Sequence, residues 1–255
     1  MIPVPKYPEG RDLLRDKVVV ITAAAGTGIG SAVARRCLEE GARVVLSDRH
    51  ERRLAEKAAE LGGVHAIPCD VTDGEQVRAL IDGAVAHHGR LDVLINNAGL
   101  GGQKSIVDMT DDEWATVLDV TLTSTFRVTR AALRQFIAQG DGGAVVNNAS
   151  VLGWRAQAGQ AHYAAAKAGV MALTRCAAVD VAEHGIRVNA VAPSLAMHPF
   201  LAKVTSEDVL AELTAREVSG RAAKPWEVAN VMVFLASDYA SYLTGEVVSV
   251  SSQHA

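Results

Sequence analysis

Short apolar segments of strand length alternate with amphipathic segments of helix length along almost the whole chain. The strand-length segments are rich in valine, isoleucine and leucine and are apolar on both faces, as in parallel strands that helices cover on both sides. This alternation predicts an α/β, Rossmann-like fold with right-handed crossovers, a doubly wound seven-stranded parallel sheet and helices on both faces. We expect strands at 17–22, 43–47, 64–69, 91–95, 144–148, 186–191 and 246–250.

Helical periodicity and capping patterns place helices between these strands. Ile29, Val33 and Cys37 recur at i, i+4 and i+8, which puts them on one helical face. Residues 72–75 (TDGE) and 110–113 (TDDE) both match the capping box that opens a helix. We expect helices at 29–40, 51–61, from 72 onward, 110–138, 160–184, 200–216 and 225–236.

Composition narrows the functional classes. The 255 residues fit one α/β domain, and a net charge of −4 without a long basic run argues against a nucleic-acid partner. Three scattered cysteines, with no CxxC pair, indicate neither a disulfide framework nor a metal site. The chain has no run of ~18 apolar residues and no apolar leader segment. We therefore expect a cytoplasmic protein that does not enter a membrane.

The same patterns predict the domain organisation. Residues 1–15 are rich in proline and charge and read as a loosely held N-terminal arm. Residues 16–255 form a single domain, with a substrate lid at about 194–220. Leu195, Met197, Phe200 and Leu201 are the apolar residues of that lid; the alternative is a buried helix edge.

A glycine-rich segment joins the first strand to the first helix at 22–30 (TAAAGTGIG). Glycines let the backbone approach a phosphate, and a helix N-terminus offers free N–H groups, so this is a dinucleotide-binding signature. The alternative is an ordinary tight turn. Asp48 ends the second strand, where a carboxylate accepts bonds from ribose hydroxyls and repels a 2′-phosphate. Together they favour NAD, while Arg49 leaves NADP possible.

Ser150, Tyr163 and Lys167 carry the chemistry. Tyr163 and Lys167 are four residues apart in a predicted helix and share one face. A tyrosine with a pKa near 10 is a poor acid or base at neutral pH, and a nearby ammonium is expected to lower that pKa. Ser150 follows the fifth strand, at the sheet edge where α/β proteins bind ligands. A chance YxxxK is the alternative.

These motifs together resemble the short-chain dehydrogenase/reductase family over about Leu14 to the end. The resemblance also rests on CDV at 69–71, NNAG at 96–99, RVNAVAP at 187–193 and LTG at 243–245. It implies hydride transfer between an alcohol or ketone and a nicotinamide cofactor, in a homotetramer or homodimer. It assigns cofactor contacts to Ala24, Thr27, Gly28, Ile29, Gly30, Asp48, Arg49, Asp70, Val71, Asn97, Ala98, Gly99, Tyr163, Lys167, Pro193 and Ala196.

The chain departs from the family pattern at four places. Ala23-Ala24 replaces Thr-Gly, which we expect to be tolerated if the alanine φ is negative. Thr121 stands where many members carry a catalytic Asn, so its catalytic role is open. The segment after Pro193 ends in His198 instead of Thr, a lid residue by our interpretation. Ser251-Ser252-Gln253 replaces Asp-Gly-Gly.

Several segments resemble a bacterial branch that degrades the C and D rings of steroids. That branch oxidises a hydroxy-methyl-oxo-octahydroindene propanoyl-CoA, which implies a CoA thioester as substrate. Trp154 and Arg155 come shortly after Ser150, and we expect them either to line the substrate cleft or to pack within their own loop. Lys203, Arg155 and Arg216 are candidate contacts for CoA phosphates. A 3-oxoacyl-carrier-protein or acetoacetyl-CoA reductase is the alternative substrate class. A methyltransferase and a non-catalytic NAD-binding regulator are alternatives of other classes.

Overall fold

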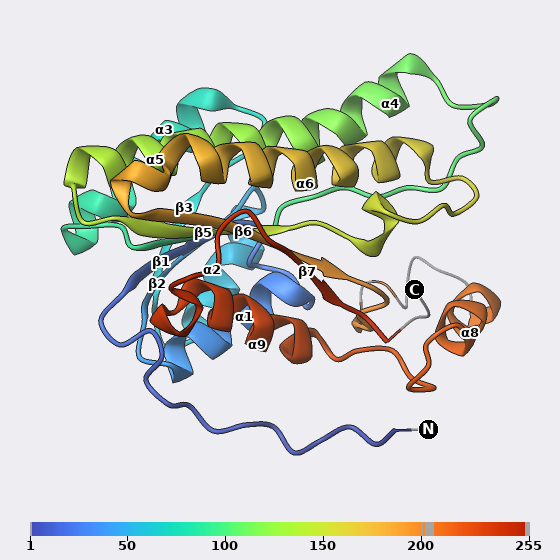
Figure 1. Cartoon of the computed structure of the whole chain (residues 1–255), viewed down its shortest axis with the longest axis horizontal. Helices are drawn as coiled ribbons and strands as arrows, with labels where there is room; N and C mark the ends of the chain where they lie inside the picture. Colours follow the sequence, from blue (N-terminus) through green and yellow to red (C-terminus); the bar gives the residue numbers. More distant parts are fainter. Residues whose placement is uncertain (1, 200, 202–206, 253–255) are drawn as a thin grey trace.

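One seven-stranded sheet runs through the middle of the molecule, in the order β3-β2-β1-β4-β5-β6-β7 (Figure 1). The computed structural model describes residues 2–199, 201 and 207–252. Every strand pairs in parallel with its neighbours, which confirms the predicted doubly wound sheet. The strands are β1 (Val18–Ile21), β2 (Arg43–Asp48), β3 (His65–Pro68), β4 (Val93–Asn96), β5 (Gly143–Asn148), β6 (Ile186–Pro193) and β7 (Val247–Val250).

Helices cover both faces of the sheet (Figure 1). One face carries α1 (Ile29–Glu39), α2 (Glu51–Glu60) and α9 (Pro225–Ala236). The other carries α3 (Gly74–His88), α4 (Asp111–Leu118), α5 (Ser124–Gln139) and α6 (Ala161–Val181). The short α8 (Glu207–Ala215) follows β6. None of the described helices has both the length and the apolarity needed to cross a bilayer.

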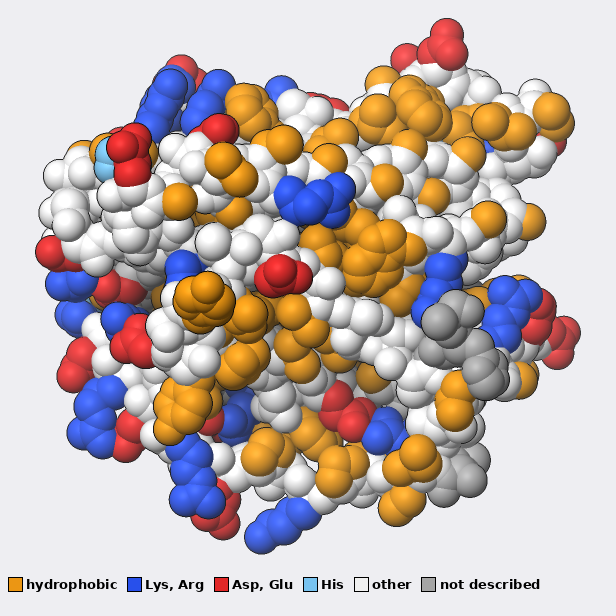
Figure 2. Space-filling view, in the orientation of Figure 1, with side chains coloured by type: hydrophobic (Ala, Val, Ile, Leu, Met, Phe, Trp, Pro, Cys, Tyr) orange, Lys and Arg blue, Asp and Glu red, His pale blue; other side chains and the backbone are white. Residues whose placement is uncertain are grey.

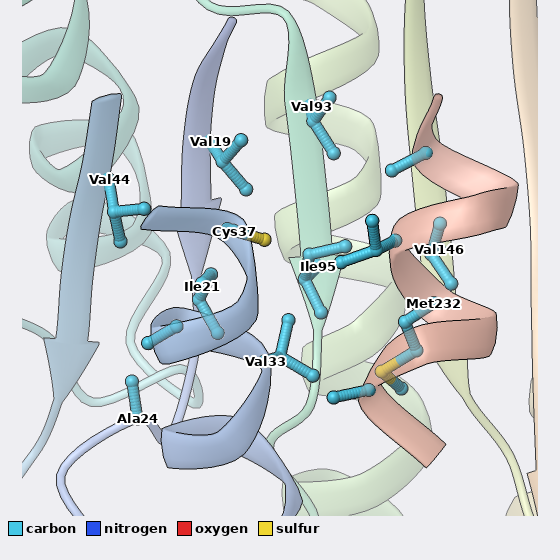
Figure 3. Packing of buried hydrophobic residues seen from close by; sticks show 14 of the residues in the cluster. Val19, Ile21, Ala24, Val33, Cys37, Val44, Val93, Ile95, Val146 and Met232 are labelled. Carbon is cyan, nitrogen blue, oxygen red and sulfur yellow. The ribbon is translucent and has the colours of Figure 1, made fainter. Parts of the chain in front are cut away.

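The strands are buried on both faces, so each side chain packs against one helical layer or the other. Figure 3 shows β-branched side chains of β1, β4 and β5 against Val33 and Cys37 of α1 and Met232 of α9. On the opposite face Val18 and Val20 join the cluster that α3 and α5 complete. Burying one such side chain contributes about 1.5–3 kcal/mol to the free energy of unfolding. Because many of them are buried, the sheet is a rigid support for the loops at its edges.

The structure confirms one of the two predicted capping boxes and contradicts the other. The box at 110–113 is confirmed, since the Thr110 hydroxyl accepts a bond from the Glu113 N–H. The box at 72–75 is wrong: α3 begins at Gly74, and the Asp73 carboxylate caps it. Thr72 instead donates to Asp70 at 2.7 Å, because that carboxylate lies closer to its hydroxyl than the helix end does.

The N-terminal segment lies along α1 and α9 (Figure 1). The Ile2 N–H donates to the Ser219 carbonyl at 2.8 Å, and the Tyr7 hydroxyl donates to Glu39 at 2.6 Å. Leu14 is fully buried against the core. The described part of the predicted arm is therefore tied to the domain at several points.

Candidate active site

The predicted site residues meet at one edge of the sheet. The glycine segment follows β1, Asp48 ends β2, Asn97 follows β4, Ser150 follows β5 and Pro193 ends β6. All of these strands are parallel, so their carboxyl ends lie at the same edge, on both sides of the β1–β4 switch point. This is the position where open α/β sheets bind ligands.

The glycine segment forms an uncapped helix N-terminus. Gly28 is the N-cap of α1, no side chain caps the helix, and its first turn contains no acidic residue. The first N–H groups of α1 are therefore free to bind an anion. Gly30 is required for packing, because a Cβ there would lie 2.4 Å from Asn97 Nδ2 and 2.5 Å from the Ala23 carbonyl oxygen.

Ala23 corrects one expectation. Its φ is +51°, whereas we expected an alanine at this point to need a negative φ. The left-handed conformation costs an alanine about 1–2 kcal/mol relative to its right-handed form. Asn97 holds the turn in place: its Nδ2 donates to the carbonyls of Thr22 at 3.2 Å and of Ala23 at 3.1 Å.

Two carboxylates flank the expected adenosine position. The half-buried Asp48 accepts bonds from the Ala25 N–H at 3.2 Å and the His50 N–H at 3.0 Å. Burial raises the pKa of Asp48, and the Ala25 N–H and the neighbouring Arg53 and Arg49 oppose that rise. The backbone and hydroxyl of Thr72 both donate to Asp70 and lower its pKa. Both side chains are fixed by the backbone before any ligand arrives.

Ser150, Tyr163 and Lys167 lie together, as the sequence predicts. Ser150 is 8% exposed, accepts a bond from the Leu152 N–H at 3.2 Å, and shares a hydrogen bond with Tyr163. Lys167 is 3% exposed and its Nζ is 5.5 Å from the centre of the Tyr163 ring. The Lys167 ammonium donates to the Asn148 carbonyl at 2.5 Å.

The direction of the Tyr163 shift is opposite to the sequence expectation. Burial raises the pKa of Tyr163 to about 12, although the bond with Ser150 opposes the rise. Burial also lowers the pKa of Lys167 to about 8. The ammonium bonds to the Asn148 carbonyl, so desolvation decides the charge state of the phenol. At neutral pH Tyr163 therefore carries its proton in this structure.

Asn148 is a site residue that the sequence reasoning missed. Its Nδ2 donates to Asn97 Oδ1 at 3.1 Å, and its carbonyl accepts from Lys167. A continuous chain of bonds thus runs from the Ala23 carbonyl through Asn97 and Asn148 to the lysine. The sequence contains a signal for this residue, because two asparagines end an otherwise apolar strand.

Thr121 lies in a π-helical segment, Asp119–Thr123, between α4 and α5. Its side chain is fully buried, and its hydroxyl accepts from the Leu100 N–H at 3.0 Å and donates to the Leu100 carbonyl at 3.1 Å. The loop it holds passes both Lys167 and Tyr163: a Cβ on Gly99 would lie 3.4 Å from Lys167 Nζ, and one on Gly101 would lie 3.8 Å from the Tyr163 ring. Thr121 therefore positions this loop.

Backbone contacts with residue 223 fix the described part of the expected lid. Ala196 pairs with Ala223, and the Met197 N–H donates to the Ala223 carbonyl at 2.9 Å. Glu217, which the sequence reasoning missed, is 4% exposed and accepts a bond from the Ser252 hydroxyl at 2.8 Å. Phe200, Lys203 and Gln253 lie outside the described residues.

His198 lies against the glycine segment. Its Nε2 is 3.4 Å from the point where a Cβ of Gly28 would stand. Burial lowers the pKa of His198. Trp154 is 52% exposed beside the site, and Arg49 is exposed at the end of β2. In the described part of the chain, no three His, Cys, Asp or Glu side chains are placed to share a metal ion.

Residues 23–252 match the family model described as "Enoyl-(Acyl carrier protein) reductase", one of those for short-chain dehydrogenases and reductases. The chain belongs to the short-chain dehydrogenase/reductase family. It is therefore an oxidoreductase acting on CH–OH or C=O groups, and family members use NAD(P).

Individual relatives agree with this assignment. The chain is 66% identical to a Mycobacterium tuberculosis protein named (5R,7aS)-5-hydroxy-7a-methyl-1-oxo-2,3,5,6,7,7a-hexahydro-1H-indene-carboxyl-CoA reductase, over 98% of this chain and 97% of the relative. It is 44% identical to cis-4-hydroxycyclohexanecarboxylate dehydrogenase of Sinomonas cyclohexanicum, over 92% and 95%. A crystal structure of a short-chain dehydrogenase from Mycobacterium smegmatis superposes with a TM-score of 0.89 at 59% identity, covering 99% of both chains.

Proposed function

We propose that this enzyme interconverts a ketone and a secondary alcohol on a bicyclic, steroid-derived acyl-CoA with NAD(H) as cofactor. The observation that carries the proposal is the Ser150–Tyr163–Lys167 cluster at the same sheet edge as the uncapped N-terminus of α1. A methyltransferase has no use for this cluster. A non-catalytic NAD-binding regulator does not require a partly buried tyrosine beside a buried lysine.

The residues at the edge fit a nicotinamide dinucleotide. The free N–H groups that follow Gly28 suit its diphosphate, and the Asp48 carboxylate suits the adenine ribose. By resemblance, Asp70 and Val71 hold the adenine, and Lys167 also binds the nicotinamide ribose. The same carboxylate at Asp48 would repel the 2′-phosphate of NADP.

The chain's own residues handle the proton. The cofactor, when bound, supplies or accepts the hydride. Ser150 orients the substrate oxygen, and Tyr163 gives its proton to that oxygen in reduction or takes it in oxidation. A phenol that holds its proton at neutral pH can donate it to the substrate oxygen in reduction. The Lys167 ammonium, whose Nζ is 5.5 Å from the centre of the Tyr163 ring, would supply the positive charge that stabilises the phenolate that remains.

Similarity to the Mycobacterium tuberculosis reductase supports the bicyclic substrate. The sequence resemblance implies a propanoyl side chain on an octahydroindene and an oxidation, whereas the name of that relative gives a carboxyl-CoA on a hexahydroindene and a reductase. We take the shared chemistry, a methyl-oxo-hydroxy bicycle joined to CoA, as the substrate class. The rigid bicycle loses little entropy on binding.

Steady-state kinetics test this proposal. We expect kcat/KM for the bicyclic CoA thioester to exceed that for acetoacetyl-CoA or a short 3-oxoacyl carrier-protein substrate. NAD(H) should surpass NADP(H) at least tenfold in kcat/KM, about 1.4 kcal/mol. Equal activity with acetoacetyl-CoA would reject the steroid substrate, and equal activity with NADP(H) would reject the role of Asp48.

We also propose that the enzyme is a homotetramer or homodimer in the cytoplasm, where CoA thioesters and NAD(H) are available. Large apolar side chains are exposed on α4, α5 and α6: Trp114, Phe126, Ile137 and Val179. Figure 2 shows hydrophobic side chains gathered over α4 and along α6. Contacts between copies would remove this surface from water. Analytical ultracentrifugation would test the assembly, and a monomer would reject it.

A further inference from the structure

A cavity of about 670 Å³ lies beside the catalytic residues, between the loop after β4 and the loop before α6. The Lys104 N–H donates to the Gly159 carbonyl at 2.9 Å and joins the two loops. Gly159 has a φ of +74°, and a Cβ there would lie 2.8 Å from Gln103 Cγ. The wall of the cavity therefore depends on a glycine at this position. Its volume is in the range of small-molecule sites.

The loop that lines the cavity also passes Tyr163. Gly101 faces the Tyr163 ring, and Gly102 faces His162, whose Nε2 would lie 3.4 Å from a Cβ on that glycine. Gln103, the next residue, already lines the cavity. Two residues of extended chain span at most about 7 Å, so a ligand held at Tyr163 can reach the cavity with one short arm.

The lining favours an arm that carries amides and ends in an anion. Gln103, Gln157 and Gln160 bring carboxamides, and alanines supply apolar wall between them. Gln160 is the N-cap of α6 but makes no side-chain capping bond. Lys104 is the one charged side chain among the described lining residues. It is 41% exposed, and its Nζ is 3.7 Å from Glu113 Oε1, a loose pair that a phosphate can displace.

We propose that this cavity binds the pantetheine arm of the acyl-CoA substrate, with Lys104 contacting a CoA phosphate. The inference rests on the proposed function, because the acyl ring must then lie at Tyr163 and Ser150. The carboxamides of Gln103, Gln157 and Gln160 can hydrogen-bond to the two amides of pantetheine, whereas a hydrocarbon ring offers them no hydrogen bond. The site would therefore discriminate CoA thioesters from the corresponding free acids.

The assignment of the pantetheine arm to this cavity can be tested by comparing three forms of one acyl group. We would measure kcat/KM with NAD⁺ for the bicyclic alcohol of the proposed function as the free acid, the N-acetylcysteamine thioester and the CoA thioester. Binding of free coenzyme A would be measured by calorimetry at low salt. Ala158→Trp places a bulky ring at the wall of the cavity and narrows it, Lys104→Met removes its charge, and Lys6→Met is the control for loss of a surface charge.

We expect wild-type kcat/KM to be at least tenfold higher for the CoA thioester than for the N-acetylcysteamine thioester. Ala158→Trp should abolish most of that preference and leave the N-acetylcysteamine thioester within twofold. Lys104→Met should weaken coenzyme A binding at least fivefold without changing the KM for NAD⁺, and Lys6→Met should change neither.

Three results would overturn the inference. They are equal losses with both thioesters in Ala158→Trp, no preference for CoA in the wild type, and coenzyme A binding that does not respond to Lys104→Met. Failure of the proposed function gives a different result. In that case no form of the alcohol is oxidised, while Lys104-dependent binding of coenzyme A still supports the site.

Discussion

Replacement of Thr121 by valine tests the positioning of the catalytic loop. Valine keeps the shape of threonine and removes the hydroxyl, and with it the bonds to the Leu100 N–H and carbonyl. At about 1 kcal/mol for each hydrogen bond, we expect a loss of about 2 kcal/mol in the free energy of unfolding. Leu100 is 37% exposed, so water can reach its freed backbone groups and the loss should not be much larger. In a chain of this size that corresponds to a fall in Tm of about 4–8 °C.

The same substitution should lower kcat/KM at least tenfold, about 1.4 kcal/mol, because the loosened loop passes both Lys167 and Tyr163. Thr121→Ser keeps the hydroxyl and should stay within threefold of the wild type. Thr121→Asn should change kcat by less than about tenfold, since an amide can also accept from one group and donate to the other. Urea unfolding and steady-state kinetics of the three variants are the measurements. Wild-type stability and kcat/KM in Thr121→Val would refute the positioning role.

Further predictions concern the proton transfer, the strained turn and the histidines. Tyr163→Phe should lower turnover at least ~10²-fold and leave the Kd for NADH unchanged, whereas Lys167→Ala should lower turnover and also weaken NADH binding. Stopped-flow kinetics would measure turnover, and fluorescence titration would measure the Kd. If Tyr163→Phe retained a tenth of the activity, another group would have to be the acid. Ala23→Gly should remove the strain of a left-handed alanine, about 1–2 kcal/mol, but glycine also adds about 0.4–1 kcal/mol of conformational entropy to the unfolded state. We therefore expect urea unfolding to show a net stabilisation of about 0.5–1 kcal/mol. A destabilised variant would contradict the strain at Ala23. Burial and the neighbouring His87 lower the pKa values of His65 and His88. The unfolded chain then binds more protons near and below pH 6.5, and stability should fall as the pH drops from 7.5 to 5.5. His65→Gln should reduce this fall, and an unchanged pH dependence would exclude the contribution.

The sequence predicts best those features that depend on local periodicity or on repeated local chemistry. The seven strands follow from apolar runs, and the Thr110 box follows from residues three apart in one turn. The helix break near Thr121 was not predicted. It depends on hydroxyls that bond back into the helix: Ser124 donates to the Val120 carbonyl at 2.6 Å and Thr125 to the Thr121 carbonyl at 2.8 Å. Serine and threonine are common in ordinary helices, so the pattern alone does not indicate a π-helical turn.

The candidate site was predicted by residue but not by charge state. Ser150, Tyr163 and Lys167 could be located because strand ends and helical spacing bring them to one edge. Whether an ammonium lowers the pKa of a phenol depends on where the ammonium points and how much water remains, and neither is encoded in a spacing of four residues. Here Asn148 draws the Lys167 ammonium to its carbonyl, and the glycine segment is bonded to the same asparagine through Asn97. One set of hydrogen bonds thus joins the glycine segment to the lysine, and we expect a ligand that orders the glycine segment to act on Lys167 as well.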